Sequence, residues 1–240
     1  MVDRRMAFLA HLAELRKRII ISASVLAVTF GICLYFAIPL LKIMMVPAGH
    51  MQFVYLTPLE PFMVKVKVAF FAGFALALPV ILYEILAFAA PGMKAKEKKI
   101  IFPTIVSMIV LFVGGVVFGY KFIMPISTEW LLAQAGQIMK AAVSASAYVT
   151  YAGWFLLGFG ISFETPLFIL LMVRLGILSP AKLRASWRYA VIIILVLSAI
   201  ITPDWSPVTM AVMGLPMLAF YILSCVLAGF VAPKRKEETA

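Results

Sequence analysis

Two glutamates lie inside long apolar stretches, where an ionisable side chain is costly and usually has a function. Glu164 is near the middle of the stretch 151–173, and Glu84 is about seven residues from the end of the stretch 66–90. A proton relay would need a chain of such groups, and two do not make a chain. Each glutamate is interpreted either as a hydrogen-bonded link between helices or as an intramembrane docking point for a polar group of a partner.

Two other glutamates lie among basic residues beside apolar stretches. Glu14 belongs to the segment 11–18 and Glu97 to the segment 94–99. Apolar residues recur every three or four positions over 8–19, which predicts an amphipathic helix that lies at a membrane interface before the chain turns into its first span. Taken singly, each of these glutamates is interpreted as a residue that balances the charge of neighbouring Lys and Arg residues at a lipid surface.

Side chains for metal binding or nucleophilic catalysis are scarce. Cys33 and Cys225 sit in apolar runs, where free cysteine behaves as a small buried hydrophobe, and His11 and His50 lie in different segments. No zinc site or disulfide framework is expected from these four residues. The zinc-protease pattern His-Glu-x-x-His and Gly-rich phosphate loops are absent from the sequence. The sequence therefore predicts no enzyme, no metal and no cofactor.

The composition indicates a membrane protein. Apolar residues make up 65% of the 240 residues and charged residues 13%, whereas soluble domains have about 45–50% and about 25%. The net charge of +11 could suit nucleic acid, but membrane proteins gather Lys and Arg in short cytoplasmic loops. We therefore expect lipid around the chain and no nucleic-acid partner.

The apolar stretches predict the fold. A spanning helix needs about 20 apolar residues, and five stretches meet this length. Residues 188–201 add a short sixth span, because the turn at 202–207 returns the chain directly into the last stretch. We predict an all-α integral membrane protein: one domain, 1–240, forming a bent six-helix bundle with short fifth and sixth helices and short helices capping its outer face at 39–65 and 124–150. The predicted spans are about 19–38, 66–90, 100–123, 151–173, 188–201 and 208–232, followed by a cytoplasmic tail, 233–240.

The distribution of positive charge predicts the orientation. Sixteen of the 21 Lys and Arg residues lie in the four segments that six spans leave on one side. This bias places both termini in the cytoplasm, with the protein in the cytoplasmic (inner) membrane. The four segments are 1–18, 91–99, 174–188 and 233–240, with five, four, four and three such residues.

Small and helix-breaking residues predict how the spans are shaped. Gly115-x-x-x-Gly119 favours close helix packing. Prolines inside spans are expected to kink or break them. These prolines are Pro79, Pro166 and Pro216.

Short motifs follow one another in a fixed order along the six spans. They are His11-Leu-x-Glu14-Leu-Arg16-x-Arg18, Pro79-Val-Ile-Leu-Tyr83, Ala87-Phe88-x-x-Pro91 followed by Glu97, Phe118-x-Tyr120, Phe163-Glu164-x-Pro166 and Thr202-Pro203-Asp204. In this order the chain resembles, over nearly its whole length, the TatC family, the multi-spanning component of the twin-arginine protein translocase.

The resemblance implies a signal-peptide receptor and core subunit for the export of folded proteins, with the proton-motive force as energy source. In that family the residues matching Glu14 and Glu97 receive the Arg-Arg motif of the signal peptide, and those matching Arg16 and Phe88 belong to the same site. The chemistry of arginine is consistent with this role, because its guanidinium can form two parallel hydrogen bonds to a carboxylate, whereas the lysine ammonium cannot.

The resemblance also implies single-span partner subunits of the TatA and TatB type and several copies per complex. The residues assigned to partner docking or intramembrane polar contacts are Glu164, Tyr120, Asp204 and Glu84. The chain departs from the family at two positions: Glu84 stands where the family often has Gln, and Pro207-Val208 stands where a Gln often follows the Asp204 position.

The main alternative is a secondary transporter for a small solute. Glu84, Glu164 and the intramembrane prolines favour it, because broken helices build midplane binding sites. It is disfavoured because the sequence has no internal repeat and few polar residues within its spans. A channel is weaker still, because no span carries enough polar residues to line a pore.

Overall fold

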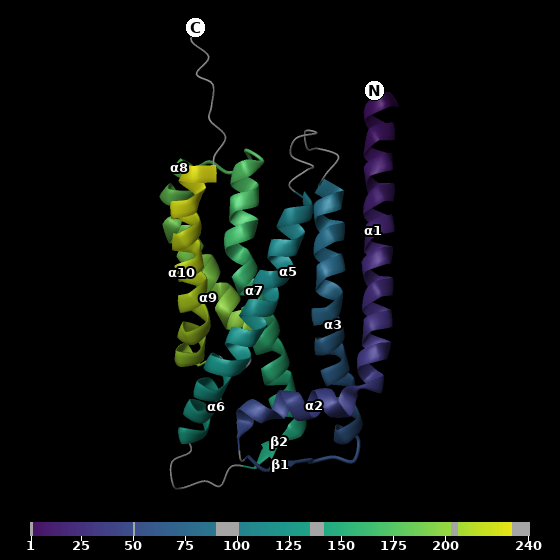
Figure 1. Ribbon diagram of the computed structural model, residues 1–240, viewed down its shortest axis with the longest axis vertical. Helices are drawn as coiled ribbons and strands as arrows, with labels where there is room; N and C mark the ends of the chain where they lie inside the picture. Colours follow the sequence, from purple (N-terminus) through teal and green to yellow (C-terminus); the bar gives the residue numbers. More distant parts are fainter. Residues whose placement is uncertain (1, 50, 90–100, 135–141, 203–205, 232–240) are drawn as a thin grey trace. The chain divides into compact units, whose positions relative to one another are not determined.

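The computed structural model describes residues 2–49, 51–89, 101–134, 142–202 and 206–231, and within them the chain is almost entirely helical (Figure 1). The helices are α1 (Val2–Tyr35), α2 (Ala37–Met45), α3 (Glu60–Ala89), α5 (Ile101–Phe118), α6 (Met124–Ala133), α7 (Ala145–Arg174), α8 (Pro180–Ala185), α9 (Trp187–Ile201) and α10 (Pro207–Val231). A 3₁₀ turn, Val46–Ala48, follows α2, and a π-helical turn, Gly119–Ile123, joins α5 to α6.

Within the described residues, five helical segments are long and apolar enough to cross a membrane. They are His11–Tyr35, Glu60–Phe88, Phe102–Ala133, Ala145–Arg174 and Pro207–Val231. The helix α9 is apolar but has 15 residues, or about 22 Å at 1.5 Å per residue, against a hydrocarbon core of about 30 Å. The sixth span therefore stays a prediction.

The N-terminal helix differs from the sequence-based prediction. Instead of an interfacial helix that turns into a span, α1 runs without interruption from Val2 to Tyr35. The reason is local, because residues 2–30 contain neither Pro nor Gly and nothing there interrupts helical hydrogen bonding. Likewise α3, α7 and α10 continue through Pro79, Pro166 and Pro216, so these prolines do not end their helices.

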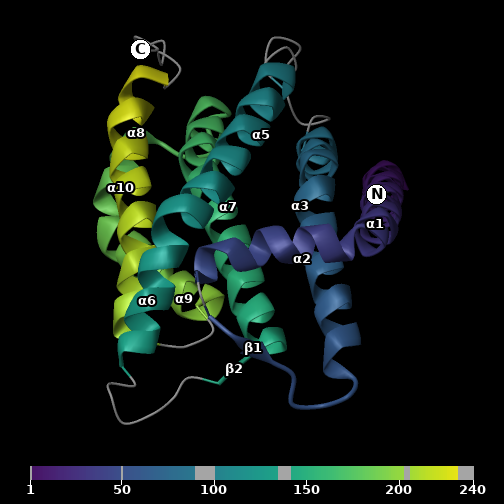
Figure 2. The same ribbon diagram turned by 60° about the horizontal axis from the view of Figure 1, so that its bottom comes forward.

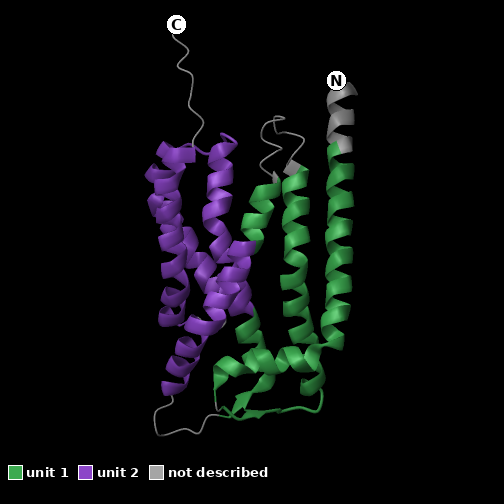
Figure 3. Ribbon diagram, viewed as in Figure 1, with its two compact units in different colours: residues 1–109, 139–153 green, residues 110–138, 154–240 purple. Residues whose placement is uncertain are grey.

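The chain divides into two compact units (Figure 3): residues 1–109 with 139–153, and residues 110–138 with 154–240. In the first unit α1 packs along α3. Thr29 Oγ1 donates a 2.9 Å hydrogen bond to the Gly73 carbonyl, and a Cβ on Gly73 would lie 2.9 Å from Phe30 Cα. Only glycine allows the two backbones to approach so closely.

Short elements cover one end of the helices of the first unit. Here α2 runs across the direction of α1 and α3 (Figures 1 and 2). Phe53–Val54 (β1) pairs in parallel with Val143–Ser144 (β2), which leads directly into α7. Tyr148, in the first turn of α7, donates a 3.3 Å hydrogen bond to the Met44 carbonyl of α2. These contacts fasten the start of α7 to α2.

The second unit is built on close packing of α5 and the later part of α7. A Cβ on Gly115 would lie 2.6 Å from the Phe159 carbonyl oxygen, and one on Gly119 would lie 3.0 Å from Phe159 Cβ. The Gly-x-x-x-Gly pair therefore lets the two helices approach closely, as the sequence predicts. A further apolar cluster joins α7, α8, α9 and α10; its buried members are Val173, Leu183, Ile194, Met217, Tyr221 and Ala228.

Candidate functional site

One arginine is held between two glutamates in the first unit. Arg18 Nη2 and Nε donate to Glu14 Oε1 at 2.8 and 3.2 Å, and Arg18 Nη1 donates to Glu84 Oε2 at 2.8 Å. Glu14 and Arg18 are one helical turn apart on α1, a spacing that brings side chains together. Glu84 comes from α3, so this cluster, which we call the Arg18 cluster, ties the two helices together.

The members of the Arg18 cluster differ in their access to solvent. The side chain of Glu84 is 9% exposed, whereas those of Arg18 and Glu14 are 22% and 32% exposed. A carboxylate offers about four acceptor positions on its two oxygens. Glu14 Oε2 accepts no hydrogen bond from any described residue, so Glu14 keeps acceptor positions for a second donor.

An aromatic pair and a groove adjoin the Arg18 cluster. The rings of His11 and Phe88 stack with centroids 4.3 Å apart and planes 20° apart. A groove of about 360 Å³ runs between α1 and α3, and Arg18 and Glu84 supply its polar edge. Its other walls are apolar and include Leu15, Ile19, Leu26, Ile81, Ile85 and Phe88. The arrangement offers carboxylate oxygens at the edge of an apolar groove.

The structure brings together only part of the predicted cytoplasmic site. Glu14 and Phe88 lie on facing parts of α1 and α3, joined to each other through Arg18, Glu84 and His11. Arg16 is exposed on α1 and forms no salt bridge with a described residue. Glu97 and Asp204 lie outside the described residues.

Glu164 is an unusual group in the second unit. Its residue is 7% exposed, and neither carboxylate oxygen has a hydrogen-bond partner among the described residues. A buried polar group without a partner costs free energy. Tyr120, also assigned to partner docking, is half-buried in the π-helical turn of the same unit.

Two polar residues near the start of α3 have structural roles that the sequence analysis missed. Glu60 accepts hydrogen bonds from the backbone N–H groups of Leu56 (2.7 Å) and Ser146 (3.1 Å) and from the Ser144 hydroxyl. The spacing Thr57-x-x-Glu60 before an apolar run is that of a helix-capping box and could have revealed it. Glu60 also joins the β1 side of the first unit to the start of α7.

Lys67 is the second missed residue. Its Nζ donates to Ser146 Oγ at 2.7 Å and to Thr150 Oγ1 at 2.8 Å. The lysine comes from α3 and both hydroxyls come from the first turns of α7. No single motif carries this signal, because Lys67 is 79 and 83 positions from its two hydroxyl partners and meets them only through packing.

Among the described residues, no group of three or more His, Cys, Asp or Glu side chains could hold a metal ion. What these residues form instead is a set of long apolar helices, an ion-pair cluster at a helix end and an orphaned buried carboxyl. These features define a helical, multi-spanning membrane protein.

Comparison with known proteins places the chain within this class. The family model described as Sec-independent protein translocase protein (TatC) matches residues 10–216. The chain belongs to the TatC family. It is therefore a component of a protein translocase and not an enzyme, as the sequence motifs indicated.

Individual relatives cover the chain almost completely. The TatC protein of Koribacter versatilis is 36% identical over 97% of this chain and 89% of its own length. The TatC protein of Carboxydothermus hydrogenoformans is 35% identical over 98% of this chain and 97% of its own length. A crystal structure of a TatC protein, described as a twin-arginine translocase receptor, is 30% identical with a TM-score of 0.84, covering 92% of this chain and 99% of its own.

Proposed function

We propose that the chain is the signal-peptide receptor subunit of a twin-arginine translocase. It lies in the cytoplasmic membrane with both termini in the cytoplasm, and its carboxylates Glu14, on α1, and Glu97, which follows α3 in the sequence, bind the Arg-Arg motif of folded export substrates. The membership in the TatC family and the likeness to a solved twin-arginine translocase receptor support this role. The positive-inside distribution of Lys and Arg supports the orientation.

The observation that carries the proposal is the Arg18 cluster. Two carboxylates, on α1 and α3, hold one guanidinium with three hydrogen bonds of 2.8 to 3.2 Å. Charge-assisted bonds from a planar guanidinium are stronger than neutral ones and select Arg over Lys. Glu14, which is partly exposed and has an unused oxygen, would accept a guanidinium of the signal peptide in the same way.

The groove beside the cluster suits the rest of such a peptide. A twin-arginine signal continues from its basic motif into an apolar segment, and the groove between α1 and α3 continues from its polar edge into apolar walls. We assign the second carboxylate of the receptor site to Glu97, in the basic segment 94–99. The many cations around the two carboxylates would repel a basic peptide elsewhere on this face, which favours binding at these carboxylates.

We further propose that Glu164 is a docking point for single-span subunits of the TatA or TatB type. Its two carboxylate oxygens are buried and have no partner among the described residues. A polar side chain from a partner helix would supply the missing hydrogen bond and relieve the cost of burial. Tyr120 and Asp204 are assigned to the same partner contacts, and several copies of the chain are expected per complex.

Site-specific photo-crosslinking tests the receptor proposal. A photoreactive residue placed in turn at positions 94–99 should crosslink a twin-arginine precursor in intact membranes. A photoreactive residue in place of Lys121, a cation outside the cytoplasmic segments, is the control and should not crosslink it. A precursor whose two arginines are replaced by lysines should lose most of the crosslink. Equal crosslinks from the Arg-Arg and Lys-Lys precursors would contradict the proposal.

A further inference from the structure

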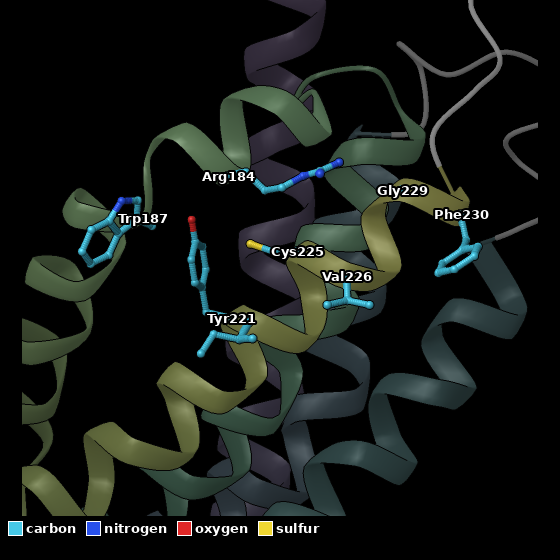
Figure 4. A pocket seen from close by; sticks show the side chains of 8 residues that line it. Arg184, Trp187, Tyr221, Cys225, Val226, Gly229 and Phe230 are labelled. Atoms are coloured by element: carbon cyan, nitrogen blue, oxygen red, sulfur yellow. The ribbon is translucent and has the colours of Figure 1, made fainter.

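A groove opens in the second unit beside α8 and the last turns of α10 (Figure 4). Its volume is about 650 Å³. Three side chains of α10 on this groove are largely exposed: Ile222 (55%), Val226 (59%) and Phe230 (84%). Arg184 of α8 and Trp187, the first residue of α9, also line it. The groove therefore combines an apolar wall with a guanidinium.

The floor of this groove is fixed by a buried contact. The Tyr221 hydroxyl donates a 2.6 Å hydrogen bond to the Leu183 carbonyl, and both residues are 7% exposed. The bond fastens α10 to α8 directly below Arg184. The helix α8 is itself capped by the Ser179 hydroxyl, which accepts from the Lys182 N–H at 3.2 Å. A preformed groove of this kind can bind a ligand without a large ordering cost.

Among the described residues, no carboxylate forms a salt bridge with the cations at the groove. Arg184 and Arg188 are exposed and form no salt bridge with any described residue. From 174 to 231 the sequence has one acidic residue, Asp204, which comes 20 positions after Arg184. An anionic ligand would supply the missing counter-charge.

The residues beside the groove are those typical of a membrane interface. Arg188 lies over the ring of Trp187, with its guanidinium carbon 5.7 Å from the ring centroid, and Trp187 is 55% exposed. Tryptophan favours the level of the lipid headgroups. Basic pockets beside spanning helices bind the headgroups of anionic lipids.

We propose that this groove binds one anionic phospholipid. Its phosphate contacts Arg184, and one acyl chain lies along Ile222, Val226 and Phe230. A soluble phosphate would leave the apolar wall uncovered, and an apolar helix of a partner would leave the guanidinium groups without a counter-charge. A phospholipid with a net negative charge satisfies both requirements.

Photolabelling with lipid tests this site on the full-length chain. The protein is placed in phosphatidylcholine nanodiscs with a small share of phosphatidylglycerol that carries a diazirine in its acyl chain, and labelled peptides are quantified by mass spectrometry. The label should concentrate on residues 222–230 and exceed the label from diazirine phosphatidylcholine severalfold. Arg184→Gln should reduce the phosphatidylglycerol label about tenfold, because it removes charge-assisted bonds to the phosphate. Arg174→Gln, at another exposed cation of the same unit, should leave the label unchanged.

A second variant tests the apolar half of the site. A Cβ on Gly229 would meet no atom within 4 Å, although this residue lines the groove. Gly229→Leu should therefore fill the groove without a backbone clash and abolish the label from both lipids there. Gly114→Leu, at an equally open glycine on α5, is the matched control and should have no effect.

Three results would overturn the lipid site. The first is equal labelling of the Arg184→Gln and Arg174→Gln variants. The second is label spread evenly along α10 in the wild-type protein. The third is loss of the label when a single-span partner subunit is added, with a crosslink from residues 222–230 to that subunit, which would assign the groove to a partner helix.

Discussion

Arg18 Nη1 lies 2.8 Å from Glu84 Oε2, although the two residues are 66 positions apart in sequence. The bond joins α1 to α3, as the stacked rings of His11 and Phe88 also do. The carboxylate of Glu84 thus engages an arginine of the same chain. If Glu14 belongs to the proposed receptor site, Glu84 acts on it through Arg18, as a positioning residue.

Replacing Glu84 should loosen this arrangement in a graded way. Glu84→Gln keeps a hydrogen-bond acceptor for Arg18, whereas Glu84→Ala removes it, so the alanine variant should be less stable. In a double-mutant cycle with Arg18→Ala, we expect a coupling energy of about 1 kcal/mol; Arg18 is partly exposed, and solvent weakens such pairs. The coupling energy is obtained from the free energies of unfolding of the wild type, the two single variants and the double variant in detergent micelles. A coupling near zero would show that the ion pair contributes nothing to stability.

The two adjacent glycines of α5 offer a matched test of helix packing. A Cβ on Gly115 would lie 2.6 Å from the Phe159 carbonyl, whereas one on Gly114 would meet nothing within 4 Å. Gly115→Ala should therefore destabilise the chain by about 1–3 kcal/mol. Gly114→Ala should be neutral or stabilising by about 0.5–1 kcal/mol. The measurement is thermal unfolding of both variants side by side. Equal midpoint temperatures for the two variants would contradict the packing role of Gly115.

Much of this fold could be predicted from the sequence because lipid leaves few alternatives to long apolar helices. The apolar stretches predicted the five long helices, and Gly115-x-x-x-Gly119 predicted a close helix contact. The boundaries were less accurate: α3 begins at Glu60 and α7 at Ala145, each six residues before the predicted span. Polar contacts formed by Glu60 and Ser146 extend these helices beyond their apolar parts.

Glutamine and alanine at position 164 should have different effects. A protonated carboxyl can both donate and accept a hydrogen bond. Glu164→Gln keeps both capacities and should retain the single-span partners, whereas Glu164→Ala should weaken their co-purification. Signal-peptide crosslinking at 94–99 should survive both changes. If both variants retain their partners but fail in transport, a proton-linked role would replace the docking role.

Cysteine labelling should decide whether α9 spans the membrane. In a chain whose Cys33 and Cys225 have been replaced, single cysteines near 5, 95, 180 and 237 should react only with reagents that reach the cytoplasm. Cysteines near 50, 137 and 205 should react from outside. This pattern follows from the positive-inside distribution of charge. Labelling of positions 180 and 205 from the same side would contradict six spans, because α9 lies between them in the sequence.

The Arg18 cluster shows where sequence reasoning reaches its limit. Motif order singled out Glu14 and Phe88, and its place in an apolar stretch singled out Glu84 as either a link between helices or a docking point. The sequence could not reveal that Glu84 meets Arg18, because that contact depends on the register between α1 and α3. The same holds for Lys67, whose hydroxyl partners Ser146 and Thr150 come from a different helix.

The affinity of the purified chain for a twin-arginine signal peptide tests the central claim most directly. The wild-type chain should bind an Arg-Arg peptide, and Glu14→Ala and Glu97→Ala should each abolish most of this binding while the protein stays folded. The double variant should lose less than the sum of the two single effects, because both carboxylates hold one motif. Glu129→Ala, which removes an exposed glutamate of α6, should bind as the wild type does. Unchanged affinity in both single variants, or equal affinity for a Lys-Lys peptide, would contradict the receptor site.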